Sequence, residues 1–214
     1  TVAPWIVFGL YLLSFTMIIL IGLLLRPFRF GAAEPFIMEL PPYRLPLVRT
    51  VGLRAWQESR DFLYRASTFI IIGVIVIWYL THFPADVDPG SAETFAGKIG
   101  LFLAPVFDPI GIQWAETVAL FFGFIAKEIL IGALAVIYGS ANLAADISAQ
   151  ISPLQGLSFM VFTLIYSPCV ATVAAIRSES HSWRITLLSV GMGLILAWLT
   201  SFVVYQGGLY LGFQ

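Results

Sequence analysis

The stretch that decides the fold is WIVFGLYLLSFTMIILIGLLL, residues 5–25, which contains no charged side chain. A helix crosses the hydrocarbon core of a bilayer with about 20 mostly apolar residues, so this stretch predicts a membrane-spanning helix. A signal peptide would have a basic start and a shorter apolar core. The sequence begins with Thr1 and not with methionine, and we interpret the chain as part of a longer protein.

Apolar stretches of similar length recur along the chain. Hydrophobic residues make up 59% of it and charged residues 11%, whereas a soluble domain is about 45–50% apolar and about 25% charged. Helices satisfy their backbone hydrogen bonds within one segment, as lipid requires. We therefore predict an all-α integral membrane protein, a polytopic helical bundle with about five transmembrane segments. The further segments are residues 62–81, 115–138, 157–176 and 185–205.

Segment 115–138 differs from the others because it contains Glu116, Lys127 and Glu128. If the helix breaks at 127–128, each half spans about half a membrane, and the helix dipoles favour Lys127 at the first end and Glu128 at the second start. If it is continuous and tilted, Lys127 and Glu128 project about 100° apart and each needs a partner on another helix. Ionisable groups at membrane depth are costly and usually functional, which makes both residues candidates for an ion path.

The connections between the segments differ in charge. Residues 26–61 carry most of the arginines, whereas residues 82–113 are mainly acidic. Positively charged connections stay in the cytoplasm, so we place the Pro/Arg-rich connection 26–61 inside and the loop 82–113 outside. Within this external loop, residues 95–111 predict a short amphipathic helix that Pro105 and Pro109 interrupt.

The last connection, residues 177–184, carries Arg177 and Arg184 and should also be cytoplasmic. It reaches the cytoplasm only if segment 115–138 makes no net crossing. The distribution of positive charge therefore favours a broken or re-entrant element at 115–138.

A second candidate site lies in segment 157–176, at Tyr166, Ser167, Pro168 and Cys169. Proline has no N–H, and its ring clashes with the carbonyl four residues earlier, so the helix must kink or open at Pro168. Thr172 shares the face of Cys169, because the two residues are three apart. A thiolate is a strong ligand for late divalent metals, although a lone cysteine is usually a small buried hydrophobe.

Several classes of function leave no signature in the sequence. Metalloprotease, serine hydrolase and P-loop motifs are missing, so we do not expect this chain to be an enzyme by itself. A basic domain or stripe is missing as well, which argues against a nucleic-acid partner. A single cysteine excludes an internal disulfide.

Three segments resemble the ferrous iron transport protein B (FeoB) family in order and spacing. They are PFIMELPPYRLP at residues 35–46, GFIAKE at 123–128 and YSPCVAT at 166–172. The first is the most specific, since a twelve-residue match with three prolines is hard to obtain by chance. The resemblance implies that residues 1–214 are the C-terminal, Gate-type transmembrane part of a larger transporter and contain its second Gate motif.

The resemblance also implies roles for particular residues. Cys169 occupies the Pro-Cys position of the second Gate and would take part in iron passage or gating. From its charge at membrane depth we add Glu128 as a second, transient Fe²⁺ ligand. Lys127, Ser167 and Thr172 would line the same path, and Pro168 would break the helix. A coupling loop would connect nucleotide state to the pore or, alternatively, form a stiff polyproline-type linker. It consists of Glu39, Pro41, Pro42, Tyr43 and Arg44.

The family further implies what surrounds this part of the protein. A GTP-hydrolysing domain with Mg²⁺ would lie upstream in the full-length protein, and this part itself would bind no cofactor. Expected partners are the lipid bilayer, the upstream half of the transporter, a small cytoplasmic accessory protein of the iron system and, in a homo-oligomer, further copies. The expected location is the bacterial inner membrane, crossed several times.

Two alternatives to ferrous iron uptake remain open. One is a Gate-type transporter of nucleosides or another small solute, and the other is a membrane scaffold that moves nothing. The sequence leaves open whether an iron permease would act as a channel or a pump. It also leaves the metal selectivity open, because the same ligands bind Zn²⁺ or Mn²⁺.

Overall fold

The computed structural model describes residues 3–25, 46–139, 143–166 and 169–213. All regular secondary structure in these ranges is helical, which confirms the predicted fold class. The helices are α1 (Ala3–Leu25), α2 (Val48–His82), α3 (Phe95–Phe107), the 3₁₀ turn η1 (Asp108–Ile110), α4 (Trp114–Ile125), α5 (Ile129–Tyr138), α6 (Leu143–Gln150), α7 (Pro153–Ile165), α8 (Val170–Ser180) and α9 (Trp183–Tyr210).

The five predicted segments correspond to α1, α2, α4 with α5, α7 with α8, and α9. Among the described residues, three helical segments are long and apolar enough to cross a membrane, or four if the bent pair Phe95–Ile110 and Trp114–Ile125 is one span. Within α2, the apolar part is the shorter segment Ile70–His82, which is below the length required of a candidate span.

The chain divides into two compact units, Thr1–Tyr64 and Arg65–Gln214, which we describe separately. In the first unit, α1 is apolar on all sides, as expected of a helix surrounded by lipid or other helices. The first unit also contains the start of α2 at Val48, so the predicted helix start at residue 62 is wrong. Charged residues continue the helix there, with Arg54 paired to Glu58 one turn later at 3.4 Å.

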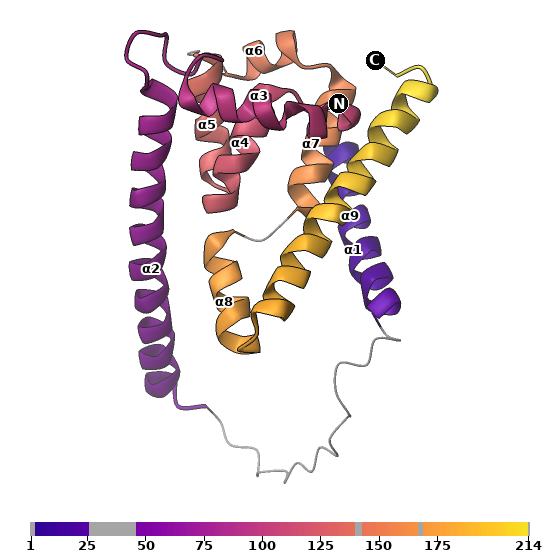
Figure 1. Ribbon diagram of the computed structural model, residues 1–214. Helices are drawn as coiled ribbons and strands as arrows, with labels where there is room; N and C mark the ends of the chain where they lie inside the picture. Colours follow the sequence, from indigo (N-terminus) through magenta and orange to yellow (C-terminus); the bar gives the residue numbers. More distant parts are fainter. Residues whose placement is uncertain (1–2, 26–45, 140–142, 167–168, 214) are drawn as a thin grey trace. The chain divides into compact units, whose positions relative to one another are not determined.

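In the second unit, α7 and α9 pack against each other (Figure 1). Ser158 and Ser201 lie at this contact, and both are fully buried. The Ser158 hydroxyl donates to the Ile110 carbonyl at 2.6 Å, and the Ser201 hydroxyl donates to the Ser158 carbonyl at 3.1 Å. Small side chains allow membrane helices to approach closely, so α9 serves as the support against which α7 is fixed.

The predicted helix in the loop after α2 is present as α3, but its predicted interruption at Pro105 is wrong. Pro105 lies within the last turn of α3, and the change to a 3₁₀ turn comes at Asp108. The chain then turns at Gly111, whose φ of 75° is left-handed, and α4 leaves at 103° to the preceding helical segment. Glycine adopts that φ without steric cost. Pro105 lacks the N–H that would donate to the Leu101 carbonyl, so it removes one backbone hydrogen bond from α3 without ending the helix.

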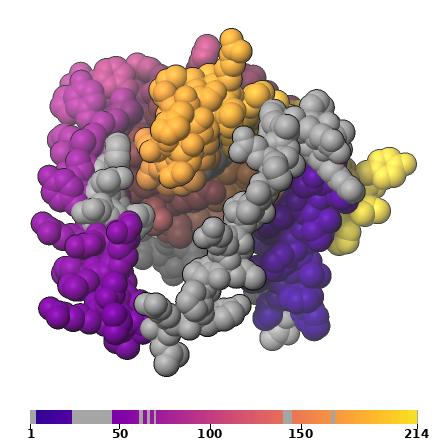
Figure 2. Space-filling model, turned by 90° about the horizontal axis from the view of Figure 1, so that it is seen from below, coloured from indigo at the N-terminus to yellow at the C-terminus, as the bar shows by residue number. Residues whose placement is uncertain are grey.

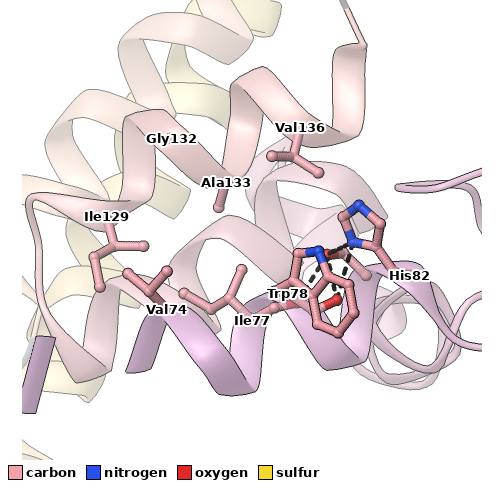
Figure 3. Close-up of a pocket in the computed structure, with 9 residues that line it drawn as sticks. Val74, Ile77, Trp78, His82, Ile129, Gly132, Ala133 and Val136 are labelled. Carbon is pink, nitrogen blue, oxygen red and sulfur yellow. Dashed lines mark hydrogen bonds between the residues drawn. The ribbon is translucent and has the colours of Figure 1, made fainter. Parts of the chain in front are cut away.

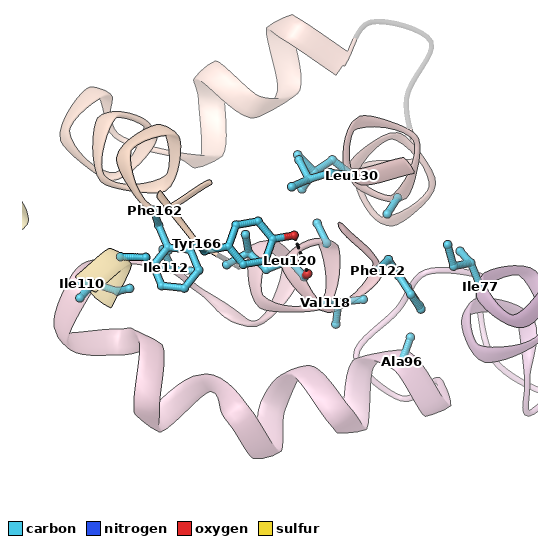
Figure 4. Packing of buried hydrophobic residues seen from close by; sticks show 14 residues of the cluster. Ile77, Ala96, Ile110, Ile112, Val118, Leu120, Phe122, Leu130, Phe162 and Tyr166 are labelled. Carbon is cyan, nitrogen blue, oxygen red and sulfur yellow. Dashed lines mark hydrogen bonds between the residues drawn. The ribbon is translucent and has the colours of Figure 1, made fainter. Parts of the chain in front are cut away.

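The buried core of the second unit gathers around α4 (Figure 4). Phe122 of α4 is 0% exposed, and Phe162 of α7 stacks on Tyr166 with ring centroids 5.5 Å apart. Gly100 of α3 brings that helix close to α4, because a Cβ there would lie 2.7 Å from the Trp114 carbonyl oxygen. The core therefore fixes α4, the helix that leads to the candidate site.

Candidate functional site

Helices α4 and α5 form an antiparallel hairpin. At its base, the Tyr138 hydroxyl at the end of α5 donates to the carboxylate of Glu116 in the first turn of α4. The other Glu116 oxygen accepts from the Gln113 N–H at 3.0 Å, which caps α4. Since residues 116 and 138 lie at the same end, residues 126–128 form the opposite tip. The structure confirms that segment 115–138 is broken and shows its two helices folded back on each other as a hairpin.

The tip of the hairpin carries the two charged candidates. Ala126 ends α4 in an extended conformation, and Glu128 is the N-cap residue of α5. The helices have 12 and 10 residues, about 15 to 18 Å at 1.5 Å per residue, which is about half of a 30 Å hydrocarbon core. Lys127 is half-buried and Glu128 is exposed. Both charged residues therefore lie at the tip of the hairpin, at the end opposite to the Glu116–Tyr138 contact.

The second candidate site is an interruption between α7 and α8. Tyr166 and Cys169 both have extended backbone, with ψ of 167° and 163°, so the predicted opening of this helix is confirmed. Cys169 is the N-cap residue of α8, and its Sγ lies 3.3 Å from the Thr172 hydroxyl. Ser167 and Pro168 lie outside the described residues.

The hairpin tip and the interrupted helix meet. Lys127 Nζ donates to the Thr163 carbonyl at 3.2 Å and lies 4.9 Å from the centroid of the Tyr166 ring. The Tyr166 hydroxyl in turn donates to the Leu120 carbonyl at 3.4 Å. A Cβ on Gly123 would lie 2.7 Å from that hydroxyl, so only glycine permits this approach. In Figure 1 the tip lies at the level where α7 ends and α8 begins.

Cys169 and Glu128 belong to the same cluster. Lys127 lies within electrostatic reach of both, and Glu128 within reach of Cys169. Figure 2, the view from below, shows α8 in orange on the face turned toward the viewer. The structure thus brings four of the predicted site residues together: Lys127, Glu128, Cys169 and Thr172.

Sequence reasoning missed one member of the cluster, Thr163, and assigned no role to Tyr166, which it placed in the second candidate site. The Thr163 hydroxyl is buried and has no hydrogen-bond partner in the part of the chain that the structure describes. Tyr166 is 5% exposed and supplies the aromatic face beneath Lys127. A signal for both was their position in the turn before Pro168, where a helix must end and leave carbonyl groups unpaired.

The described residues leave the predicted coupling loop untested and contain no cluster of metal-ligating side chains. The proposed coupling-loop residues, Glu39, Pro41, Pro42, Tyr43 and Arg44, lie outside the described residues. Within the described ranges, no three His, Cys, Asp or Glu side chains gather as a metal site.

A separate apolar cavity of about 240 Å³ lies between α2 and α5 (Figure 3). Trp78 stacks on His82 at 5.1 Å, and the His82 ring nitrogen Nδ1 lies 2.9 Å from the Trp78 carbonyl. Ile129 and Ala133 line the opposite wall. Because nearly all of its lining is hydrocarbon, this cavity does not extend the polar cluster at the hairpin tip.

These features define a polytopic helical membrane protein in which a helical hairpin faces an interrupted helix. A family model described as Nucleoside recognition (Gate) matches residues 63–183, which include both breaks. A second model, Ferrous iron transport protein B C terminus, matches residues 7–58. No solved structure matches the chain.

Curated relatives give the same result over nearly the whole chain. The Fe(2+) transporter FeoB of Synechocystis is 46% identical, and the match covers 96% of this chain and 34% of the relative. The Fe(2+) transporter FeoB of Staphylococcus aureus strain COL is 36% identical, and the match covers 95% of this chain and 31% of the relative. A Fe(2+) transport protein A/Fe(2+) transporter FeoB fusion protein of Porphyromonas gingivalis is 29% identical, and the match covers 97% of this chain and 31% of the relative. The chain spans about a third of these relatives. It belongs to the FeoB family and corresponds to the C-terminal membrane region, including a Gate domain.

Proposed function

We propose that this chain forms part of a permease for ferrous iron in the cytoplasmic membrane, and that Fe²⁺ passes between the hairpin tip and the interrupted helix. The observation that carries the proposal is the meeting of the two helix breaks through the Lys127–Thr163 contact. Discontinuous helices that face each other near mid-membrane are a common way to build transporter sites. The names of the relatives supply the ion.

The ligand chemistry of the cluster suits a passing Fe²⁺ ion. Cys169 offers a thiol and Glu128 a carboxylate, and ferrous iron accepts both soft and hard donors. Hydroxyl groups of Thr172 and the backbone of the interruption, with Ser167, would complete a transient shell. Such a site must bind weakly enough for the ion to leave, which suits two side-chain ligands better than four.

The hairpin supports the proposed orientation in the membrane. A hairpin at 115–138 that returns to the side on which it began would let the basic connections 26–61 and 177–184 both lie in the cytoplasm, as positive charge prefers. The loop 82–113 with α3 then lies outside. A cysteine introduced at Ser180 should react with an impermeant thiol reagent added from the cytoplasmic side, and one introduced at Asn142 from the outside.

We also propose that the full-length protein carries a GTP-hydrolysing domain with Mg²⁺ in the part that this chain does not cover. The segment Glu39–Arg44 would connect that domain to the pore. An accessory protein of the iron system is a reasonable partner, since one relative is named as a fusion with Fe(2+) transport protein A. Several copies of the full-length protein would assemble into a homo-oligomer.

The test is uptake of radioactive Fe²⁺ by cells that depend on the full-length protein. Cys169→Ser keeps a small polar side chain but removes the thiol, so uptake at limiting iron should fall about tenfold. Thr200→Val on the continuous helix α9 removes a hydroxyl that bonds within its own helix at 2.7 Å and should change uptake less than twofold. Unchanged uptake with Cys169→Ser would remove the ligand role of Cys169.

A nucleoside permease is the second candidate, favoured by the description of the Gate family model. Competition separates the two functions. Excess nucleosides should leave Fe²⁺ uptake unchanged if iron is the substrate, whereas saturable nucleoside uptake without Fe²⁺ uptake would favour the alternative. A scaffold that transports nothing would show neither.

A further inference from the structure

The side chain of Lys127 binds at the carboxyl end of α7, where helix geometry creates a site for a cation. The last carbonyl groups of a helix lack partners within the helix and carry partial negative charge. Here the Phe162 carbonyl accepts from the Tyr166 N–H at 2.8 Å, and the Thr163 carbonyl accepts from Lys127 Nζ at 3.2 Å. The ammonium group therefore occupies the end of this helix.

The other groups around the ammonium also attract positive charge. The Tyr166 ring lies 4.9 Å below it, and Glu128 and Cys169 are within electrostatic reach. An aromatic face, a carboxylate and a carbonyl oxygen favour any cation, whether it is part of the chain or free. The donors that hold Lys127 thus overlap with those assigned to Fe²⁺.

One polar atom beside the ammonium has no hydrogen bond. The Thr163 hydroxyl is buried, and no group in the described ranges bonds to it. A buried hydroxyl without a partner is costly. It becomes useful if an ion takes ligands from both oxygens of Thr163, the carbonyl and the hydroxyl.

We propose that Lys127 is a tethered substitute for the transported cation: its ammonium holds the α7 end when no ion is present and competes with Fe²⁺ for it. This inference rests on the proposed function and assigns Lys127 a role that differs from ion ligation. The competition keeps the site from binding Fe²⁺ too tightly to release it. It also keeps the hairpin tip docked while the site is empty.

Three substitutions separate the charge of Lys127 from its hydrogen bond. Lys127→Met removes both, Lys127→Gln keeps an N–H donor for the Thr163 carbonyl without the charge, and Lys127→Arg keeps both. The chain provides a matched control in its other lysine, Lys98, which is exposed and lies 6.0 Å from the Phe95 ring. Lys98→Met removes the same side chain from a similar aromatic contact away from the site.

The experiment is equilibrium binding of Fe²⁺, under reducing anaerobic conditions, to the purified full-length protein and its variants. Lys127→Gln and Lys127→Met should lower the dissociation constant about tenfold or more, because a competing charge is gone, while Lys127→Arg and Lys98→Met should match the parent protein. The gain in Fe²⁺ affinity should vanish when Cys169→Ser is combined with either of these two Lys127 variants. Should Lys127→Met fail to fold, the dissociation constants of Lys127→Gln and Lys127→Arg still show whether the charge of Lys127 competes with Fe²⁺.

Two results would overturn the inference. If Lys127→Gln binds like the parent protein while Lys127→Met binds more weakly, Lys127 is a structural tether. If all variants bind equally, Lys127 does not meet the ion. Uptake by the parent protein in proteoliposomes is measured in parallel. Binding without uptake would contradict the proposed permease, yet the order of the binding constants would still decide the role of Lys127.

Discussion

Two neighbouring segments of the chain have the same length and nearly the same apolar character, yet they fold differently. Residues 153–180 and 183–210 each extend over 28 residues. The second is the continuous helix α9, whereas the first is interrupted between α7 and α8. Hydropathy alone does not distinguish them. The difference comes from Pro168, and it separates a supporting helix from one that exposes backbone groups for function.

The contact between these two segments gives the largest expected effect on stability. Ser158→Val removes the donor to the Ile110 carbonyl and adds volume to a fully buried contact. We expect a loss of about 2 to 4 kcal/mol, since an unpaired buried carbonyl and overpacking each cost about 1 to 3 kcal/mol. Thermal unfolding in detergent measures it. The control is Ser148→Val on α6, an exposed serine, which should leave the midpoint unchanged.

The second largest effect on stability is expected at the base of the α4–α5 hairpin. Tyr138→Phe removes the hydroxyl that donates to Glu116, a carboxylate only 3% exposed. A hydrogen bond to a charged group contributes about 1.5 to 3 kcal/mol, so the unfolding midpoint should fall. Tyr79→Phe, at an exposed tyrosine that stacks on Phe83, is the matched control. Equal midpoints for the two variants would contradict the closed base of the hairpin.

The smallest effect concerns two glycines of the hairpin. A Cβ on Gly123 would lie 2.7 Å from the Tyr166 hydroxyl, whereas one on Gly132 would have nothing within 4 Å. Gly132→Ala should stabilise by about 0.5 to 1 kcal/mol because alanine favours a helix. Gly123→Ala should forfeit that gain and lower Fe²⁺ uptake, since Tyr166 must move. If the two variants behave alike, the hairpin and the interruption do not touch.

Both breaks could be predicted from the sequence, because each has a local cause. Lys127 and Glu128 cannot lie comfortably in a continuous lipid-facing helix, and proline forces the opening at Pro168. The start of α2 at Val48 could not be predicted, since hydropathy identifies the membrane-crossing part of a helix and not its polar extension.

The contacts between the two breaks could not be predicted from the sequence. Lys127 and Thr163 are 36 residues apart, and Glu116 and Tyr138 are 22 apart. Periodicity and propensity describe neighbours in the chain, whereas these pairs depend on how the helices pack. The place of Thr163 in the cluster, and the contact of the Tyr166 ring with Lys127, depend on the packing of the hairpin against α7.

The central claim is that the two breaks form a single ion site, and a double-mutant cycle on Fe²⁺ uptake at limiting iron tests it most directly. The cycle compares Cys169→Ser, Glu128→Gln and the double variant in the full-length protein. Residues of one site do not contribute independently, so uptake by the double variant should be close to that of the weaker single variant. If the two losses instead multiply, Cys169 and Glu128 act separately and the claim of a single site is contradicted.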